Sequence, residues 1–509
     1  MSTDAPAVDL PALTLPDDVE TLQRMIRELL VTLHSSQQRN DKLAHQLDQL
    51  LRRLYGPRAE RIDPRQLSLF EPPPAEPEPA VPPPVEPPSA RPATRVGHGR
   101  RRLPESLPRR QVVHELSAAQ RGCPCCGALR TKIGQEISEQ LEYEPASLYV
   151  IEHVRLKYAC RTCQEQVQTA EKPPQPIERG LPGPGLLAWT TLSKHAYHQP
   201  LYRQEKFYAH HGLSISRSTT CDWMAACARL CEPLYDLMVA EILQSKAIHT
   251  DDTPVRALAG GNHALAYTGR FWVYVGDNRH PYTAFQFTPN RSRAGPLDFL
   301  DQYQGYLQAD AYAGYDELFR TRPIVEVGCW MHARRYFYEA KESDPARAHY
   351  ALAEIRRLYD VERAAKEFSS AQRQTLRERD SAPVLHRLRE WLTTQQPHIL
   401  PKSPLGKAVH YALANWKALT RYTTDGDLNI DNGAAERPLR AVALGRKNWL
   451  FVGSENGGRT AAILFSILAS IQRAAIDPFL YLRDLYRRLP TTPNHEIPQL
   501  LPNAWTPIN

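Results

Sequence analysis

The sequence predicts a multidomain α+β protein, and three observations support this fold class. The chain has 509 residues, more than one hydrophobic core normally organises, so about three to five domains are expected. Apolar residues follow helical spacing near the N-terminus and again from 186 to 237, whereas short stretches rich in β-branched and aromatic residues follow Ala247. A stretch dominated by proline separates the first helix from everything downstream.

Composition places the chain among soluble globular proteins. Hydrophobic residues make up 42% of it, and no apolar run approaches the ~20 residues that a membrane helix requires. The acidic N-terminus lacks the basic and apolar regions of a secretion signal. We therefore expect a cytoplasmic protein with no membrane partner.

The distribution of charge is more informative than its total. A net charge of +7 is weak evidence for a polyanionic partner, but seven arginines stand against one glutamate between Arg91 and Arg110. Such runs are usually solvated surface. Beside the acidic cluster described below, they favour contact with phosphates.

Residues from about Asp18 to Tyr55 carry a heptad pattern that predicts a coiled coil. Leucine dominates the d positions, and a single asparagine, Asn40, occupies an a position, which favours a parallel two-stranded coil. We expect a homodimer or a higher oligomer formed through this helix. An amphipathic helix packed on its own chain fits the pattern less well.

Proline supplies 11 of the 21 residues from Pro72 to Pro92. Neither helix nor sheet hydrogen bonding can propagate through such a segment, which predicts a stiff, extended linker.

Nine cysteines in a cytoplasmic chain indicate metal ligands or buried thiols rather than disulfides. Two CxxC pairs supply the four sulfurs of a structural zinc ion: Cys123, Cys126, Cys160 and Cys163. The 33 residues between the pairs alternate as two or three strands would, which predicts a zinc ribbon. Cys125 is the odd thiol, and His114 is a less favoured substitute ligand.

Consecutive helices are predicted from Leu186 to Leu237, and two of them have the shape of a helix-turn-helix. Gly212 would end the first, and Ser218 or Thr219 would cap the second. DNA reading and plain helical packing fit this pair equally well. In the DNA-binding interpretation, Arg217 contacts a phosphate. Burial in the helical core is predicted for three cysteines: Cys221, Cys227 and Cys231.

Five strands with intervening helices are predicted after Ala247, the first three as an antiparallel meander. The order of three strands, helix, strand, helix, strand, helix is that of a ribonuclease H-like fold. Asp251 falls on the first strand, Asp310 at the end of the fourth and Glu436 in a helix well after the fifth. A charged, mostly helical stretch from about Ser343 to Thr424 predicts an all-helical insertion.

Three acids at these places favour catalysis, although a lone Asp is usually a turn or cap residue. Carboxylates are the hard oxygen ligands required by two Mg²⁺ ions about 4 Å apart, with Mn²⁺ as an alternative. Adjacent strand residues face opposite sides, so only one of Asp251 and Asp252 can easily reach such ions. Asp431, together with Asn432, is expected to cap the helix that carries Glu436.

Long motifs extend along nearly the whole chain: LRRLYGPRAERIDPRQLSLF, the CxxC pairs, HTDDTPV, LQADAYAGYD, GCWMHARRYF, LPKSPLGKAVHYALANW, IDNGAAERPLR, GRKNWLFVGS and DPFLYLRDLYRRLP. With these motifs the chain resembles the insertion-sequence-66 family of bacterial DDE transposases. The resemblance implies a triad of Asp251, Asp310 and Glu436. Asp252 stands where the family usually has Glu, and Gly433 where it usually has a second Asn, which puts local geometry in question more than activity.

Basic residues surround the predicted triad. Arg334 and Arg335 follow the fifth strand in CWMHARRYF, with a buried Cys329 and with His332 near the substrate phosphate. Two potential ligands alone do not make a zinc site. Phosphates of the element end are expected to contact three residues at or after the Glu436 helix: Arg440, Arg446 and Lys447.

The sequence therefore predicts an enzyme that cleaves the ends of a bacterial insertion sequence and joins the 3′-hydroxyl ends to target DNA. Its partners would be double-stranded DNA and, by the resemblance, accessory proteins of the same element. We expect association with the nucleoid. Two alternatives stay open, a sequence-specific DNA-binding protein with vestigial acids and a nuclease that does not join strands.

The predicted boundaries are 1–70 for the dimerisation helix, 71–95 for the linker, 96–175 for the zinc-binding domain, 180–245 for the helical DNA-binding region, 246–460 for the catalytic domain with its insertion at about 343–424, and 461–509 for a C-terminal helical tail.

Overall fold

The computed structural model describes residues 107–144, 147–160, 162, 167–259 and 265–507, and single positions or short runs at 18–20, 23, 26–28, 30, 32, 103 and 105. The described positions from 19 to 32 are helical. The rest of the predicted coiled coil and the whole proline-rich linker lie outside the described residues. The chain divides into two compact units, 1–98 with 398–403, and 99–397 with 404–509. The elements discussed below belong to the second unit, except that the last residue of the short helix at 396–398 falls in the first.

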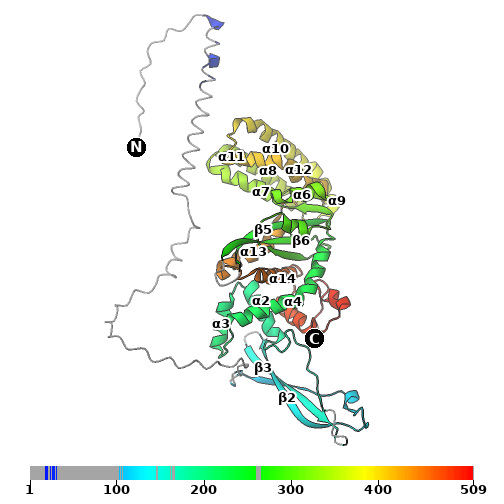
Figure 1. Cartoon of the computed structure of the whole chain (residues 1–509). Coiled ribbons are helices and arrows are strands. Elements are labelled where there is room, and N and C mark those ends of the chain that lie inside the picture. The colour runs from blue at the N-terminus through cyan, green and yellow to red at the C-terminus, as the bar shows by residue number, and fades with distance from the viewer. Residues whose placement is uncertain are drawn as a thin grey trace, which may run out of the picture. The chain divides into compact units, whose positions relative to one another are not determined.

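A small sheet with two long strands follows the N-terminal region (Figure 1). Strand β3 (Ser147–Ala159) lies at its centre, antiparallel to β2 (Thr131–Glu144) and parallel to β1 (Arg109–His114), and the short β4 (Gln168–Thr169) pairs with its end. The expectation that strands fill the interval between the two cysteine pairs is confirmed. The single-turn helix η2 (Ala118–Arg121) precedes the first pair.

Glu142 of β2 connects this sheet to the helices that follow. Its buried carboxylate accepts hydrogen bonds from the backbone N–H groups of Tyr143 and Leu186, each at 2.9 Å. Leu186 lies in the first turn of α2 (Pro184–His195), which has no side-chain cap of its own. A carboxylate from a distant strand thus satisfies free donors at a helix N-terminus, where negative charge is favoured.

Two further helices complete the predicted helical region: α3 (Leu201–His210) and α4 (Arg217–Ile242). Gly212 follows α3 with a φ of +74°, as predicted for a residue that ends a helix. The N-cap of α4 is Ser216, whose hydroxyl accepts the N–H of Thr219 at 3.2 Å. The predicted caps Ser218 and Thr219 are therefore wrong, since the helix begins two or three residues earlier than they imply.

The cysteines of α4 are not equivalent. Cys227 and Cys231 are buried, as predicted, but Cys221 is exposed. The buried face of α4 follows Thr220, Trp223, Met224 and Cys227, and Cys221 lies off that stripe.

The central sheet has five strands in the order β7-β6-β5-β8-β9. The predicted antiparallel meander is confirmed, because β6 pairs with both β5 and β7, and β5 continues the sheet by parallel pairing with β8, which pairs in parallel with β9. The strands are β5 (Ala247–Leu258), β6 (Ala266–Val275), β7 (Thr283–Thr288), β8 (Gly305–Gln308) and β9 (Ile324–Val327).

Helices cover both faces of this sheet. Val255 and Ala257 of β5 pack against Ala435 and Leu439 of α13 (Gly433–Trp449) and against α14 (Glu455–Arg473). Trp272 of β6 faces the other core, which also holds residues of α2, α4 and α15 (Pro478–Arg488). The remaining elements near the sheet are α5 (Ala294–Phe299), η3 (Ala313–Tyr315), α6 (Asp316–Thr321), α7 (Trp330–Glu339), η4 (Ala340–Glu342) and, near the C-terminus, η8 (Asn494–Leu500).

Helices fill the interval between β9 and α13, and Figure 1 shows several of them gathered beside α7. They are α8 (Pro345–Ala364), α9 (Ser370–Leu376), η5 (Arg377–Ser381), α10 (Ala382–Gln395), η6 (Gln396–His398), α11 (Pro404–Ala414), α12 (Trp416–Thr420) and η7 (Arg421–Thr424). The charged stretch is therefore helical, as predicted. No helix in the described ranges is long and apolar enough to cross a membrane.

The fully buried Arg377 ties these helices to the chain that leads into α13. Its guanidinium donates to both carboxylate oxygens of Glu362, at 2.8 and 2.6 Å, and to backbone oxygens of Tyr422, Asp425 and Leu428. A buried charge requires this degree of pairing and hydrogen bonding.

Replacing Gly185 with Ala is expected to destabilise the protein by about 1–3 kcal/mol, although Ala in a helix is normally about 1 kcal/mol better than Gly. An added Cβ would overlap with the Glu142 carboxylate and lie 2.5 Å from the backbone oxygen of Tyr143. Gly453→Ala is the matched control, because a Cβ there meets nothing within 4 Å. Denaturant titrations compare the two variants, and equal unfolding midpoints would contradict the cap described for Glu142.

Candidate active site

Asp251 and Asp252 point to opposite faces of β5, as strand geometry requires. Asp251 shares its face with Val255 and Ala257, which pack against α13. Asp252 faces the other side and forms ion pairs there with two arginines. Asp251 is therefore on the face covered by the helix that carries Glu436.

Asp310 lies two residues beyond β8. Its Oδ1 accepts the backbone N–H of Tyr312 at 3.2 Å, and the hydroxyl of Tyr411 donates to its backbone oxygen at 3.3 Å. The next residue, Ala311, has a φ of +61°, an unfavourable backbone region for a residue with a Cβ. Such local strain is concentrated at functional sites, where surrounding contacts hold it.

Glu436 lies in the first turn of α13. The electrostatics of Asp251 connect it to the other two acids. Burial raises the pKa of Asp251 to about 7, and the negative charges of Asp310, Asp252 and Glu436 add to this increase. Among the described residues, no ion pair neutralises Asp251 or Glu436. The fold thus brings the three predicted acids into one electrostatic cluster.

Asp252 has a contrasting environment. Its side chain is only 2% exposed, and its carboxylate pairs with Arg270 Nη1 at 2.8 Å and with Arg291 Nη2 at 2.8 Å. Arg291 also lies 3.7 Å from Asp310 Oδ2, and its guanidinium covers the ring of Tyr312 at 4.1 Å. The charge of Asp252 is neutralised by Arg270 and Arg291. Its carboxylate therefore orients Arg291 beside Asp310.

Asn432 joins α13 to β5. Its Nδ2 donates to the backbone oxygen of Thr250 at 2.8 Å, and its Oδ1 lies 3.2 Å from Nδ1 of the buried His249. Burial lowers the pKa of His249 to about 4, which keeps the ring neutral. Asn432 occupies the N-cap position of α13, as expected, but its side chain makes no capping hydrogen bond because it bonds to β5 instead.

The predicted cap of α13 is supplied by Asp431 alone. Its Oδ1 accepts the N–H of Gly433 at 2.9 Å, while Oδ2 accepts from the hydroxyl of Tyr359 at 3.0 Å. Gly433, which stands where the family usually has Asn, is the first residue of α13. Its N–H donates to the Asp431 carboxylate. Both carboxylate oxygens of Asp431 are thus engaged, one by Tyr359 of the inserted helices and one by the first residue of α13. Its role therefore differs from that of Glu436.

Cys329 and His332 lie beside Glu436 at the start of α7. Potential ligand atoms of the three residues are all within 4.8 Å of one another, so the structure adds a carboxylate to the two-residue pattern seen in the sequence. Cys329 is buried, as predicted, and its sulfur accepts the N–H of Asn432 at 3.2 Å. Burial raises the pKa of this thiol to about 12, which disfavours the thiolate needed to bind a metal.

The predicted basic residues have different environments. Four of them are exposed: Arg334, Arg335, Arg440 and Lys447. Arg446 is half-buried and donates to Thr253 Oγ1 at 2.8 Å, so part of its hydrogen-bonding capacity joins α13 to β5. Arg217 is exposed at the start of α4 and pairs with Glu205 at 3.4 Å.

Three of the four predicted zinc ligands lie together in the small sheet domain. The sulfur atoms of Cys123, Cys126 and Cys160 are within 4.8 Å of one another, and those of Cys126 and Cys160 are 3.3 Å apart. Gly127, with a φ of +73°, closes the turn by donating its N–H to the Cys123 oxygen at 2.9 Å. Cys163 lies outside the described residues. Three converging thiols with a tight turn fit a structural zinc ion.

His114, the less favoured substitute, is not in this cysteine group. Its Nε2 lies 3.0 Å from Nδ1 of His153, whose Nε2 bonds to Gln140. The structure therefore gives His114 a hydrogen-bonding role within the small sheet.

Comparison with known protein families shows which family this chain belongs to. The sequence profile described as "Transposase IS66 family" matches residues 179–460, more than half of the chain. The chain belongs to the IS66 transposase family. A second profile, "zinc-finger binding domain of transposase IS66", matches residues 120–164, and a third, "Transposase C of IS166 homeodomain", matches residues 42–112. The zinc-finger match covers the cysteine cluster and indicates zinc as the metal.

Relatives in Sinorhizobium fredii (strain NBRC 101917 / NGR234) extend the similarity along the chain. The uncharacterized protein y4jD is 32% identical over 516 residues, covering 96% of this chain and 97% of that protein. The uncharacterized protein y4qI is 30% identical over 542 residues, covering 98% and 99%. A third, y4hP, is 32% identical and covers 90% and 88%.

Sequence reasoning missed Arg270, Arg291 and the cross-sheet role of Asn432. Arg270 pairs with Pro254 in the register of β5 and β6, two residues from Asp252, so an assigned hairpin register could have indicated it. Arg291 lies in a loop after β7, and no spacing rule connects it with Asp252 or Asp310.

Replacing Cys160 with Ser is expected to remove bound zinc and lower the thermal stability of the zinc domain, because one thiolate of the tetrahedral site is lost. Cys125→Ser is the control, since Cys125 is exposed and lies outside the ligand group. Metal analysis of the purified proteins tests this. Equal zinc content in the two variants would contradict the assignment.

Asp251→Asn and Asp252→Asn are expected to change stability in opposite directions in buffer without divalent ions. The pKa of Asp251 is raised, so its ionisation weakens the fold as pH rises from about 4 to about 7, and Asn at this position should stabilise the protein at pH 7.5 by about 1 kcal/mol or more. Asp252→Asn removes the charge that pairs with two arginines and should cost about 2 kcal/mol or more.

Denaturant titrations of wild type and both variants at pH 5 and pH 7.5 measure these effects. The advantage of Asp251→Asn should shrink at pH 5, where the wild-type carboxyl is largely protonated. Destabilisation by both substitutions at pH 7.5 would contradict the charge distribution described for this site.

Proposed function

We propose that this protein cleaves the ends of its insertion sequence and joins the 3′-hydroxyl ends to target DNA, with Asp251, Asp310 and Glu436 as catalytic residues. The observation that carries the proposal is the mutual electrostatic influence of these acids, which come from a strand, a loop after a strand and a helix far along the chain. Among the described residues, neither Asp251 nor Glu436 has a neutralising ion-pair partner. The strand order β7-β6-β5-β8-β9 supports a ribonuclease H-like fold for this part.

The three carboxylates fit a pair of Mg²⁺ or Mn²⁺ ions by donor chemistry. They are hard oxygen ligands, and the pKa of Asp251 is raised first by burial and then by the negative charges of Asp310, Asp252 and Glu436, which a bound cation would offset. When bound, the two ions would supply charge stabilisation for an in-line displacement at a phosphodiester. Asp252 is outside this set because its charge is already paired.

Other residues of the chain would position the DNA. Arg291, beside Asp310, is 38% exposed and can meet a phosphate without leaving Asp252. His332 lies beside Glu436, and its buried Nδ1 has no hydrogen-bond partner in the described part of the chain, so the ring would have to turn to offer this nitrogen to a substrate oxygen. Arg334, Arg335, Arg440, Arg446 and Lys447 would contact phosphates of the element end.

The remaining segments would select and bridge the DNA ends. The zinc domain and the α3–α4 pair, with Arg217 at its turn, would bind double-stranded DNA, and the N-terminal helix would join two copies of the chain. Bringing two element ends together requires such a dimer or a larger assembly. Accessory proteins of the same element would complete the active complex.

Asp310→Asn is expected to reduce cleavage and joining by about 100-fold or more while leaving DNA binding unchanged. The substitution removes one metal-binding charge with little change in volume, and the loss of several kcal/mol of transition-state stabilisation corresponds to this factor. Asp316→Asn is the matched control, since Asp316 is an exposed residue of α6 on the same segment.

The assay incubates labelled end DNA, a target plasmid and Mg²⁺ with each variant, and follows cleaved and joined products separately. Full activity of Asp310→Asn would make the acids vestigial and leave a DNA-binding protein. Cleavage by the wild type without a joined product would indicate a nuclease instead.

A further inference from the structure

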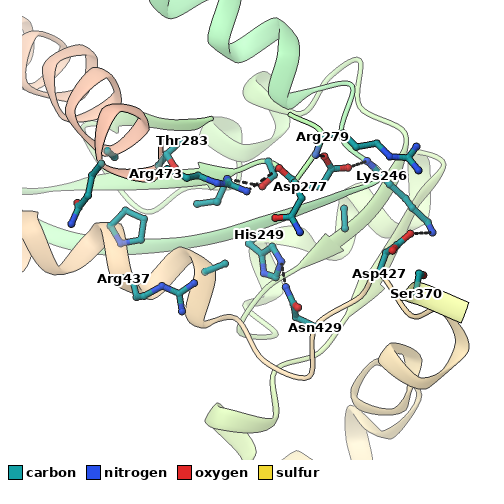
Figure 2. Close-up of a pocket in the computed structure, with 18 of the residues that line it drawn as sticks. Lys246, His249, Asp277, Arg279, Thr283, Ser370, Asp427, Asn429, Arg437 and Arg473 are labelled. Atoms are coloured by element: carbon teal, nitrogen blue, oxygen red, sulfur yellow. Dashed lines mark hydrogen bonds and ion pairs between the residues drawn. The ribbon is translucent and has the colours of Figure 1, made fainter. Parts of the chain in front are cut away.

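A cavity of about 670 Å³ lies apart from the three acids, where β5 begins and β6 ends. Its other walls come from the β6–β7 turn, α9, the loop before α13, and helices α13 and α14. Figure 2 shows His249 and Asn429 between Arg437 and Arg473 on one side and Lys246 and Asp427 on the other. The volume is that of a small-ligand site, for which ~300–1,000 Å³ is usual.

Four arginines line this cavity: Arg279, Arg373, Arg437 and Arg473. Within the part of the chain that the structure describes, none of them forms an ion pair with a carboxylate. Arg473 donates to the backbone oxygens of Gly276, Tyr282 and Asp277, and Arg373 to that of Gly426. Carbonyl groups fix these two guanidinium groups in place but leave their charges uncompensated.

The fifth cation of the cavity, Lys246, is already neutralised. Its Nζ pairs with Asp425 at 2.6 Å and with Asp427 at 2.7 Å. The acids in the cavity wall are therefore engaged by this lysine or, for Asp277, by the backbone N–H groups of Lys246, Arg279 and His280. Positive charge is in excess on the arginine side.

The excess positive charge of the cavity affects the pKa of Arg473. Burial lowers the pKa of Arg473, and although Asp277 opposes this decrease, Arg437 adds to it. Two neighbouring guanidinium groups that form no ion pair in the described part of the chain attract an anion with several acceptor oxygens. Arg437 and Arg279 are exposed at the cavity, so both can reach an incoming ligand.

We propose that this cavity binds a single nucleotide, with its phosphate held by Arg437 and Arg473 and with Arg279, across the cavity beside Lys246, contacting the other end of the nucleotide. A concave site enclosed by several elements suits a group that enters end-on, such as the terminal nucleotide of a strand or a free nucleotide, better than a continuous duplex backbone. Amide and hydroxyl groups of Asn278, Thr283, Asn429 and Gln472 supply donors and acceptors for the base and sugar.

The position of the cavity gives the site a link to catalysis. Arg437 follows Glu436 on α13, and His249 precedes Asp251 by two residues on β5. A nucleotide bound here would contact the same two elements that carry two of the three acids. Where the nucleotide is the end of a DNA strand, this inference rests on the proposed transposase function.

Binding is tested with full-length, zinc-loaded protein in buffer without other divalent ions. The probes are inorganic phosphate, deoxyadenosine monophosphate, and one short single-stranded oligonucleotide prepared with a 5′-phosphate and with a 5′-hydroxyl. The variants are Arg437→Gln and Arg279→Gln, which alter exposed side chains. Arg379→Gln is the control, because Arg379 is exposed and pairs with its neighbour Asp380.

We expect deoxyadenosine monophosphate or the 5′-phosphorylated oligonucleotide to bind at least about tenfold more weakly to Arg437→Gln and Arg279→Gln than to wild type and Arg379→Gln. Preference for the phosphorylated oligonucleotide over the monophosphate assigns the site to a DNA end, and the reverse order assigns it to a free nucleotide. Equal affinity of all four proteins for every probe overturns the proposal, as does equal binding of the 5′-phosphate and 5′-hydroxyl oligonucleotides with no binding of the monophosphate.

The cleavage assay with Asp310→Asn uses different residues and a different readout. A failed binding test would therefore leave the catalytic assignment untouched, and a failed cleavage test would leave a nucleotide site to be explained in another context.

Discussion

Repulsion between carboxylates is the constraint on which the central sheet and its flanking helices depend. Asp251 is half-buried, its burial raises its pKa to about 7, and the negative charges of Asp310 and Glu436 add to the increase. Separate contacts hold the three segments together against this repulsion. Parallel pairing of β5 with β8 brings Asp310 to the strand that carries Asp251, and the packing of Ala435 and Leu439 on Val255 and Ala257 fixes α13 over the same strand.

The protein separates its charges into groups with different partners. Arg270 and Arg291 neutralise Asp252 on one face of β5, while Asp251 on the other face forms no ion pair within the described residues. Arg377 anchors the inserted helices through Glu362 and three backbone oxygens. A third group, the arginines around the cavity, has no carboxylate partner in the described residues. Charged side chains with full ion-pair or hydrogen-bond partners stabilise the fold. Charged side chains without such partners in the described residues mark the places where we expect ligands to bind.

Much of the fold could be predicted from the sequence because the signals were local. Alternating β-branched residues identified the five strands, and the CxxC spacing identified the cysteine cluster. From the sequence, only the family motif indicated that Asp251 rather than Asp252 belongs to the triad. The structure shows which face of β5 each residue occupies. The partners of Asp252, the use of Asn432 across the sheet and the exposure of Cys221 could not be predicted, since they depend on tertiary packing and on the exact rotation of a helix. The residues of the basic cavity come from segments between β5 and α14 that are far apart in the sequence, so no local pattern predicts it.

The central claim is that Asp251, Asp310 and Glu436, but not Asp252, hold the divalent ions. Anomalous diffraction from crystals soaked with Mn²⁺ tests it most directly, because each bound ion gives its own peak beside its ligands. The account predicts manganese coordinated by Asp251, Asp310 and Glu436, with Asp252 still paired to Arg270 and Arg291. Manganese bound by Asp252, or an absence of manganese from the three acids at saturating concentration, would contradict it.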